Sequence, residues 1–149
     1  MSDRFTSLVA CELPIQLAPM SRTVTAPLAA AVSNAGGLGM LAMGRSPQHL
    51  VRRQIDEVQS LTDLPVGAGF IVLFLDEGVL EVVVERLPVV EFFWGWPDPA
   101  LVRPGVLTGW QVGTVDEARA AVDAGCHYVI AQGLEAGGHV RGTIPLAEF

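Results

Sequence analysis

Short apolar runs alternate along this chain with longer segments in which apolar residues recur at helical spacing. The apolar runs predict six strands, at residues 15–18, 38–42, 66–73, 89–94, 106–112 and 128–132. Because the runs are apolar through most of their length, they are typical of parallel strands that helices cover on both faces.

The segments between the runs carry helix signals. Residues 25–34 are rich in alanine and end at Gly36 and Gly37, a helix stop followed by a turn. Ser46 is a typical N-cap residue and Pro47 suits a first turn, so a second helix is predicted to begin there. Its apolar face is formed by Leu50, Val51, Ile55, Val58 and Leu61.

Two further helices are predicted in the second half of the chain. One covers residues 79–86, and the other begins at a capping box that runs from Thr114 to Glu117 and ends at Gly125. The apolar stripe of this last helix includes Val115, Ala118 and Val122. The segment between Pro97 and Val106 contains Pro99 and Pro104 and predicts a truncated helix.

This alternation of strands and helices predicts an α/β fold with a parallel sheet and right-handed crossovers. The pattern leaves two architectures open, a doubly wound open sheet and a closed eight-stranded barrel. Both architectures bind ligands at the C-terminal ends of their strands. Functional residues are therefore expected after Ala18, Ala42, Phe70, Trp94, Val112 and Gln132.

The composition excludes several classes of protein. The chain has 149 residues, of which 50% are hydrophobic and 17% charged, so it is too apolar to be disordered. Its net charge is −7 and it has no basic run, which argues against a nucleic-acid partner. It contains no lysine, which excludes a Walker A loop and a Schiff-base site. Length alone suggests one ordinary domain.

The sequence predicts a cytoplasmic protein without a membrane partner. The longest uncharged apolar stretch, residues 64–75, is shorter than the roughly 20 residues that cross a bilayer. The first residues lack the apolar core of a signal peptide. Cys11 and Cys126 are distant in sequence and belong to no Cys/His cluster, so free thiols and no metal site are expected.

Several predicted strand ends carry weak signals. The GxGxxA pattern that begins at Gly37 follows a helix and opens a strand, which is the reverse of a dinucleotide-binding fingerprint. Gly67 and Gly69 lie within a strand and indicate close approach of a ligand or another backbone. Among the nearby aromatic residues, Phe92 is expected in the core, and Trp94 or Trp96 in a pocket.

The richest predicted strand end is the segment 131–143, which holds four glycines together with Glu135, His139 and Arg141. Its glycines allow backbone N–H groups to face a ligand. His139 follows a glycine and precedes polar residues, and an imidazole is the commonest general base. The alternative is a flexible surface loop with a solvated histidine. His127 and His49 are interpreted as structural or surface residues.

The sequence gives no support for two common kinds of hydrolytic site. The chain lacks the GxSxG pattern of a nucleophile elbow. No pair of carboxylates stands at two predicted strand ends, as glycosidase chemistry requires.

Three segments together carry a family likeness: residues 14–20, 28–39 and 131–139. They resemble the nitronate monooxygenases, formerly called 2-nitropropane dioxygenases, and the likeness spans essentially the whole chain. This resemblance implies an FMN-dependent TIM barrel. The chain then represents an incomplete (β/α)8 barrel of about six βα units, in which residues 1–149 are the N-terminal part of a single FMN-binding domain and strands 7 and 8 are missing.

The resemblance also implies roles for particular residues. His139 matches the catalytic histidine, which removes the α-proton of a nitroalkane or contacts the nitronate. Gly69 stands where relatives often have an asparagine that contacts the flavin, so the resemblance implies a flavin contact whose side-chain part is lost or replaced by backbone. The positions that match flavin contacts are Ala18, Pro19, Met20, Gln132 and Gly137, with Gly138 adjacent. The implied reaction uses FMN and dioxygen to convert an alkyl nitronate into a carbonyl compound and nitrite. Arg141 is a second candidate for contact with the anionic substrate, with a surface salt bridge as the alternative.

Two alternatives remain at this stage. An FMN-dependent enoyl-acyl carrier protein reductase of the same superfamily shares a similar glycine-histidine loop. The chain is otherwise an inactive truncated fragment, because the loops that hold phosphate in such barrels follow strands 7 and 8. For that reason we expect it to retain FMN weakly or not at all. Unpaired barrel edges are expected to favour a homo-oligomer.

Overall fold

The computed structural model describes residues 4–21 and 23–149. These residues form a parallel five-stranded sheet whose spatial order, β1-β2-β3-β4-β5, follows the order of the chain. The strands are β1 (Gly39–Met43), β2 (Val66–Ile71), β3 (Val89–Phe93), β4 (Leu107–Val112) and β5 (Tyr128–Ala131). The α-helices are α1 (Arg4–Val9), α2 (Ala26–Asn34), α3 (Gln48–Leu61), α4 (Glu77–Val84) and α5 (Val115–Asp123). Short 3-10 turns cover Val72–Phe74, Pro99–Leu101 and Leu146–Glu148.

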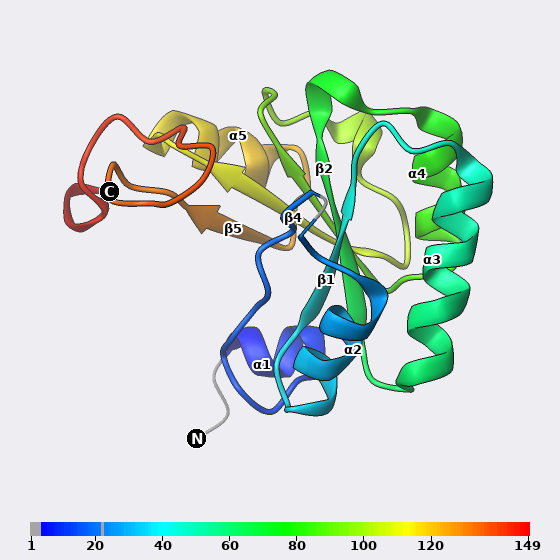
Figure 1. The fold of residues 1–149 in the computed structure, drawn as a ribbon. Helices are drawn as coiled ribbons and strands as arrows, with labels where there is room; N and C mark the ends of the chain where they lie inside the picture. The colour runs from blue at the N-terminus through cyan, green and yellow to red at the C-terminus, as the bar shows by residue number, and fades with distance from the viewer. Residues whose placement is uncertain (1–3, 22) are drawn as a thin grey trace.

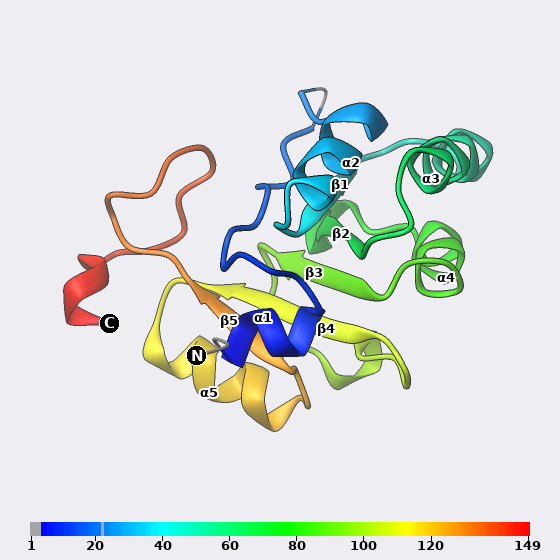
Figure 2. The same ribbon diagram turned by 90° about the horizontal axis from the view of Figure 1, so that it is seen from below.

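The sheet is curved, and helices α2 to α5 lie along its outer side (Figure 2). Helix α1 lies at the end of the sheet where the strands begin (Figure 1). This arrangement is that of a barrel segment, because a doubly wound sheet has helices on both faces. The sequence pattern had left these two architectures open.

The first predicted strand, at residues 15–18, is wrong in extent. Within it, only Gln16 pairs with the sheet, as an isolated parallel bridge to Leu38. Two backbone hydrogen bonds of 2.9 Å, from Leu17 to Leu38 and from Leu38 to Ile15, make this bridge. The flanking prolines, Pro14 and Pro19, have no N–H to extend the ladder.

The other predicted strands are correct to within one or two residues, and their ends have local causes. The strand predicted at 66–73 stops at Ile71, where the chain enters the 3-10 turn Val72–Phe74. The strand predicted at 89–94 stops at Phe93 because Trp94 has a positive φ of 56°. The truncated helix predicted within 97–106 is reduced to the turn Pro99–Leu101.

The helix starts show which capping signals were correct. Thr25 caps α2 by accepting a hydrogen bond from the Leu28 N–H, and Thr114 caps α5 in the same way. Ser46 does not cap α3, whose N-cap is Pro47 without a side-chain hydrogen bond. The helix predicted at 79–86 begins earlier, because Asp76 caps it at the Val79 N–H.

Two predicted apolar faces are partly wrong. In α3, Val51, Ile55 and Val58 are buried, whereas Leu50 and Leu61 are exposed. In α5, Val115 and Val122 are exposed and the buried residues are Glu117 and Ala121. The inward face of α5 is therefore rotated from the predicted stripe, of which Ala118 packs, partly buried, against the core.

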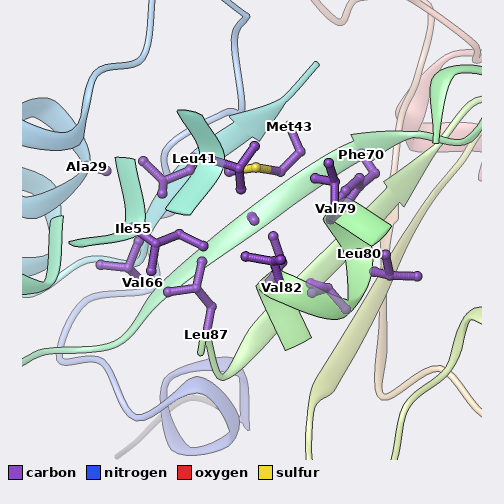
Figure 3. Packing of buried hydrophobic residues seen from close by; sticks show 14 of the residues in the cluster. Ala29, Leu41, Met43, Ile55, Val66, Phe70, Val79, Leu80, Val82 and Leu87 are labelled. Carbon is purple, nitrogen blue, oxygen red and sulfur yellow. The ribbon is translucent and has the colours of Figure 1, made fainter. Parts of the chain in front are cut away.

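The main hydrophobic core fills the space between the sheet and the outer helices (Figure 3). Phe92 and Trp110 are fully buried, with ring centroids 5.0 Å apart, which confirms the core position expected for Phe92. A smaller cluster on the inner side of the sheet contains Val9, Leu38, Met40 and Val89. Helix α1 thus covers part of the inner face.

The described residues include no helix long and apolar enough to cross a membrane. Among the same residues, no group of three His, Cys, Asp or Glu side chains is arranged to hold a metal ion. Cys11 and Cys126 are free, half-buried thiols. Burial raises the pKa of both.

Candidate functional site

Residues 18–20, which follow the bridge at Gln16, are called here the strand exit. They lie exposed beside β2. Ala18, Pro19 and Met20 are all exposed. A Cβ atom on Gly69 would come within 2.5 Å of the Pro19 ring, so glycine is required there by a side chain of this chain. A close approach at Gly69 is therefore present, but it comes from the Pro19 side chain and not from a ligand or another backbone, the two partners that the sequence predicts.

The loop after β5, residues 132–143, is called here the His139 loop. Gln132 is buried at its base and fastens it with both atoms of its side-chain amide. The amide nitrogen donates to the carbonyl oxygen of His139 at 3.0 Å. The amide oxygen accepts from the backbone N–H of Arg141 at 2.7 Å. Gln132 thus shapes the loop from within.

A partly buried ion pair fixes the other end of the same loop. Arg141 donates from Nε to Oε1 of Glu117 at 2.9 Å, and Glu117 Oε2 accepts from the Gly113 N–H at 2.7 Å. Burial alone would raise the pKa of Glu117, but the hydrogen bonds and charge of Arg141, with the backbone N–H donors, outweigh it and lower the pKa. The guanidinium of Arg141 is therefore committed to Glu117, a partner that the sequence did not predict.

His139 lies exposed in the loop and contacts an aromatic residue that directly follows β3. Its imidazole contacts the Trp94 indole edge-on, with ring centroids 5.4 Å apart and planes at 81°. Trp94 holds the left-handed backbone conformation noted above, which is uncommon for a bulky residue and concentrates at functional sites. Of the two tryptophans expected at a pocket, Trp94 contacts His139, whereas Trp96 is 61% exposed.

The glycines beside His139 leave free space around the backbone. A Cβ atom on Gly137 or Gly138 would meet nothing within 4 Å, and Gly138 has a φ of +75°. Both residues are exposed. This stretch of backbone is open to a ligand, in contrast to Gly69.

The other two histidines have different surroundings. His127 Nδ1 accepts a hydrogen bond of 3.0 Å from the Thr108 N–H, so this side chain supports the pairing of β4 with β5. His49 is exposed on α3. Both positions agree with the structural and surface roles expected for them.

A buried acid on the inner face of the sheet escaped the sequence analysis. Glu91, in the middle of β3, is only 4% exposed. Its Oε1 accepts hydrogen bonds of 2.7 Å from Gln16 Nε2 and from the Tyr128 hydroxyl. Burial raises the pKa of Glu91 despite these two donors. We call these three residues the Glu91 cluster. The signal that could have found it is a charged residue inside an apolar run.

The Glu91 cluster lines a cavity of about 730 Å³ between α1, residues 14–19 (the first segment) and β5. Ala18 and Pro19, two of the predicted flavin contacts, line the same cavity. The remaining lining residues are Arg4, Phe5, Leu8, Pro14, Gln111, His127, Val129 and Ile130. The cavity thus joins the strand exit at residue 18 to the interior of the barrel segment.

The family model and the curated relatives that match this chain are both described as nitronate monooxygenases. The family model for nitronate monooxygenases matches residues 2–80. A nitronate monooxygenase from Pseudomonas aeruginosa is 33% identical over 93% of this chain and 52% of its own length. The chain spans about half the length of the curated relatives it matches.

Two solved structures match closely in shape. FabK from Thermotoga maritima has a TM-score of 0.90 at 34% identity, over 97% of this chain and 48% of its own. A nitroalkane oxidase from Streptomyces ansochromogenes has a TM-score of 0.81 at 33% identity, over 91% of this chain and 50% of its own. The predicted fold, an incomplete (β/α)8 barrel with parallel strands, is confirmed.

Proposed function

Because the chain belongs to the nitronate monooxygenase family, we propose that it carries the histidine-bearing part of an FMN-dependent enzyme that oxidises alkyl nitronates with dioxygen. The products are a carbonyl compound and nitrite. Residues 1–149 then act as the N-terminal part of one FMN-binding barrel domain. The observation that carries the proposal is the exposed His139, held against Trp94 at the strand ends by a fastened loop.

The open surroundings of the predicted contacts support their assignment to a flat cofactor. Ala18 and Pro19 border the cavity, and Gly137 and Gly138 present open backbone. These four residues, with Met20, would contact FMN. When bound, FMN supplies the electron acceptor that the oxidation requires.

Two predicted contacts have a different role in this proposal. Both hydrogen bonds of the Gln132 side-chain amide go to the backbone of the His139 loop, so this residue would act on the cofactor by shaping that loop. Gly69 would act by admitting Pro19 to the sheet. Arg141, paired with Glu117, holds the loop and leaves substrate contact to His139.

His139 is proposed to take the α-proton from a neutral nitroalkane or to hold the nitronate. The edge-on contact with Trp94 limits rotation of the imidazole while the ring stays exposed to a ligand. A positioned general base of this kind contributes about 100- to 10,000-fold to a rate. The exposed glycine backbone beside it offers N–H donors to the oxygens of an anionic nitronate.

The test measures oxygen uptake by the purified chain with propionate 3-nitronate and FMN in excess. Oxygen uptake with the nitronate, and no NAD(P)H oxidation with an enoyl thioester, would support the proposal. The opposite pattern would favour the enoyl reductase alternative and overturn it. His139→Asn should lower kcat/KM for a neutral nitroalkane by about 100-fold or more. His49→Asn, an exposed histidine on α3, is the matched control and should leave the rate unchanged.

Binding of FMN is measured separately, by quenching of its fluorescence during titration. We propose that the chain alone binds FMN weakly, because such barrels hold the phosphate with loops after strands 7 and 8. Tight stoichiometric binding would contradict that part of the proposal. A chain that binds no FMN even at high concentration would show that these residues do not hold the cofactor by themselves.

A further inference from the structure

The Glu91 cluster joins three elements that are far apart in the sheet. Gln16 belongs to the first segment beside β1, Glu91 to the central strand β3, and Tyr128 to the edge strand β5. The Gln16–Glu91 hydrogen bond connects residues 75 positions apart, and the Tyr128–Glu91 bond connects residues 37 apart. These bonds cross the inner face of the sheet and bypass the strands between.

The residues around Glu91 make room for this arrangement. Its register partners on the neighbouring strands are both glycines, Gly69 on β2 and Gly109 on β4. A Cβ atom on Gly109 would come within 2.5 Å of the Tyr128 ring, which lies across that glycine to reach Glu91. Phe5 of α1 packs edge-on against the same ring, with centroids 5.9 Å apart. The geometry is therefore built around a buried carboxyl group.

Both outer elements lead directly into the candidate site. Gln16 lies two residues before Ala18, at the start of the strand exit. Tyr128 opens the four-residue strand that ends beside Gln132, at the base of the His139 loop. Both elements are weakly held, since the first segment has a single bridge and β5 pairs along one side only. The spacing between the two halves of the site depends on how strongly the sheet curves.

We infer that Glu91 is a positioning residue that draws the two edges of the curved sheet together, and so sets the distance between the strand exit at residues 18–20 and the His139 loop. It acts through Gln16 on one side and Tyr128 on the other. This inference rests on the proposed function for the identity of the site, but the contacts that carry it are independent of any cofactor.

The test is hydrogen–deuterium exchange of the full chain, followed by mass spectrometry of its peptides. Tyr128→Phe removes one hydrogen bond and keeps the ring over Gly109, so exchange should rise about fivefold in residues 128–141 and stay unchanged in 14–20. Gln16→Met removes the other bond and should give the reverse pattern. Glu91→Ala should raise exchange in both segments.

Rescue separates positioning from general support of the fold. Glu91→Gln keeps an amide oxygen that accepts from the same two donors, so its exchange in both segments should stay well below that of Glu91→Ala. Glu81→Gln on α4, which removes the charge from an exposed ion pair with Arg103, is the control and should leave both segments unchanged. The apparent affinity for FMN should fall in Glu91→Ala and return in Glu91→Gln.

The inference is overturned if exchange in residues 14–20 and 128–141 is unchanged in Glu91→Ala. It is also overturned if exchange rises equally in α3, residues 48–61, because that outcome means a general loss of stability. Should Glu91→Ala fail to fold, the side-specific patterns of the two single-bond variants decide. Oxygen uptake by the wild type without these patterns would refute the positioning role and leave the proposed function standing. The expected exchange patterns without oxygen uptake would support the positioning role and refute the proposed function.

Discussion

Neutralising one carboxylate in α5 should loosen the loop that carries His139. Glu117 is buried in the first turn of that helix and binds Arg141, the residue that ends the fastened part of the loop. Glu117→Gln keeps the shape and one acceptor oxygen but removes the charge. The Arg141 side chain, 28% exposed, then lies beside a neutral group.

The expected loss follows from how exposed the pair is. Removing one partner of a fully buried ion pair costs about 3–5 kcal/mol, whereas an exposed pair contributes about 0.2–1 kcal/mol. The side chains of Glu117 and Arg141 are 9% and 28% exposed, so the pair lies between these limits. We therefore expect Glu117→Gln to lower the free energy of unfolding by about 2 kcal/mol.

The assay is urea unfolding at pH 7, with Asp116→Asn as the matched control. Asp116 lies beside Glu117 in the same helical turn, but its pair with Arg119 is 81% and 75% exposed. Both substitutions remove one negative charge near the helix N-terminus, so the helix dipole contributes about equally to each. Asp116→Asn should cost less than about 1 kcal/mol. Equal losses for the two variants would refute the argument that burial makes the difference.

The pH dependence gives a second check on the same pair. The pKa of Glu117 is lowered in the folded chain, so its stabilisation is present above the ordinary value of 4.5. It is lost as the pH falls from 4.5 through the lowered folded value. The advantage of the wild type over Glu117→Gln should shrink in that range, and a constant difference down to low pH would contradict the assignment.

Three other outcomes are expected. Gly142→Ala should destabilise the chain by several kcal/mol in urea, because its Cβ would overlap the backbone at the base of the loop, whereas Gly137→Ala, which meets open space, should change it by less than about 0.5 kcal/mol. Burial raises the folded pKa of Glu91, so the thermal stability of the wild type relative to Glu91→Gln should fall as the pH rises above 4.5; a flat difference in Tm would contradict this. Cys11 and Cys126 should react with a disulfide reagent at pH 8 more slowly than free cysteine, since burial raises the pKa of both thiols.

The strands were largely predictable because a parallel strand covered on both faces reads as an apolar run whatever its partners are. The segment at 15–18 has the same composition, yet its flanking prolines restrict it to one bridge. The inner face of α5 was not predictable from periodicity. Glu117 turns inward to reach Gly113 and Arg141, and this rotation leaves Val115 and Val122 exposed.

The candidate site was likewise predictable only in part from the sequence. The His139 loop and Trp94 were visible as glycines, a histidine and an aromatic residue at predicted strand ends. The sequence could not show that Gln132 and Arg141 fasten that loop, or that Glu91 bonds two residues from distant segments. Such bonds depend on sheet curvature and on which strands lie opposite each other, and no local pattern encodes either.

The order of the strands has a consequence for how the chain folds. Each strand pairs with the next one along the chain, so every βα unit finds its neighbour already synthesised as it leaves the ribosome. Contacts between adjacent units are short in sequence and form early. The hydrogen bonds of the Glu91 cluster can be complete only after Tyr128, the most C-terminal of its members, has been synthesised. Folding can therefore proceed from the N-terminus, unit by unit, and the final bend of the sheet comes last.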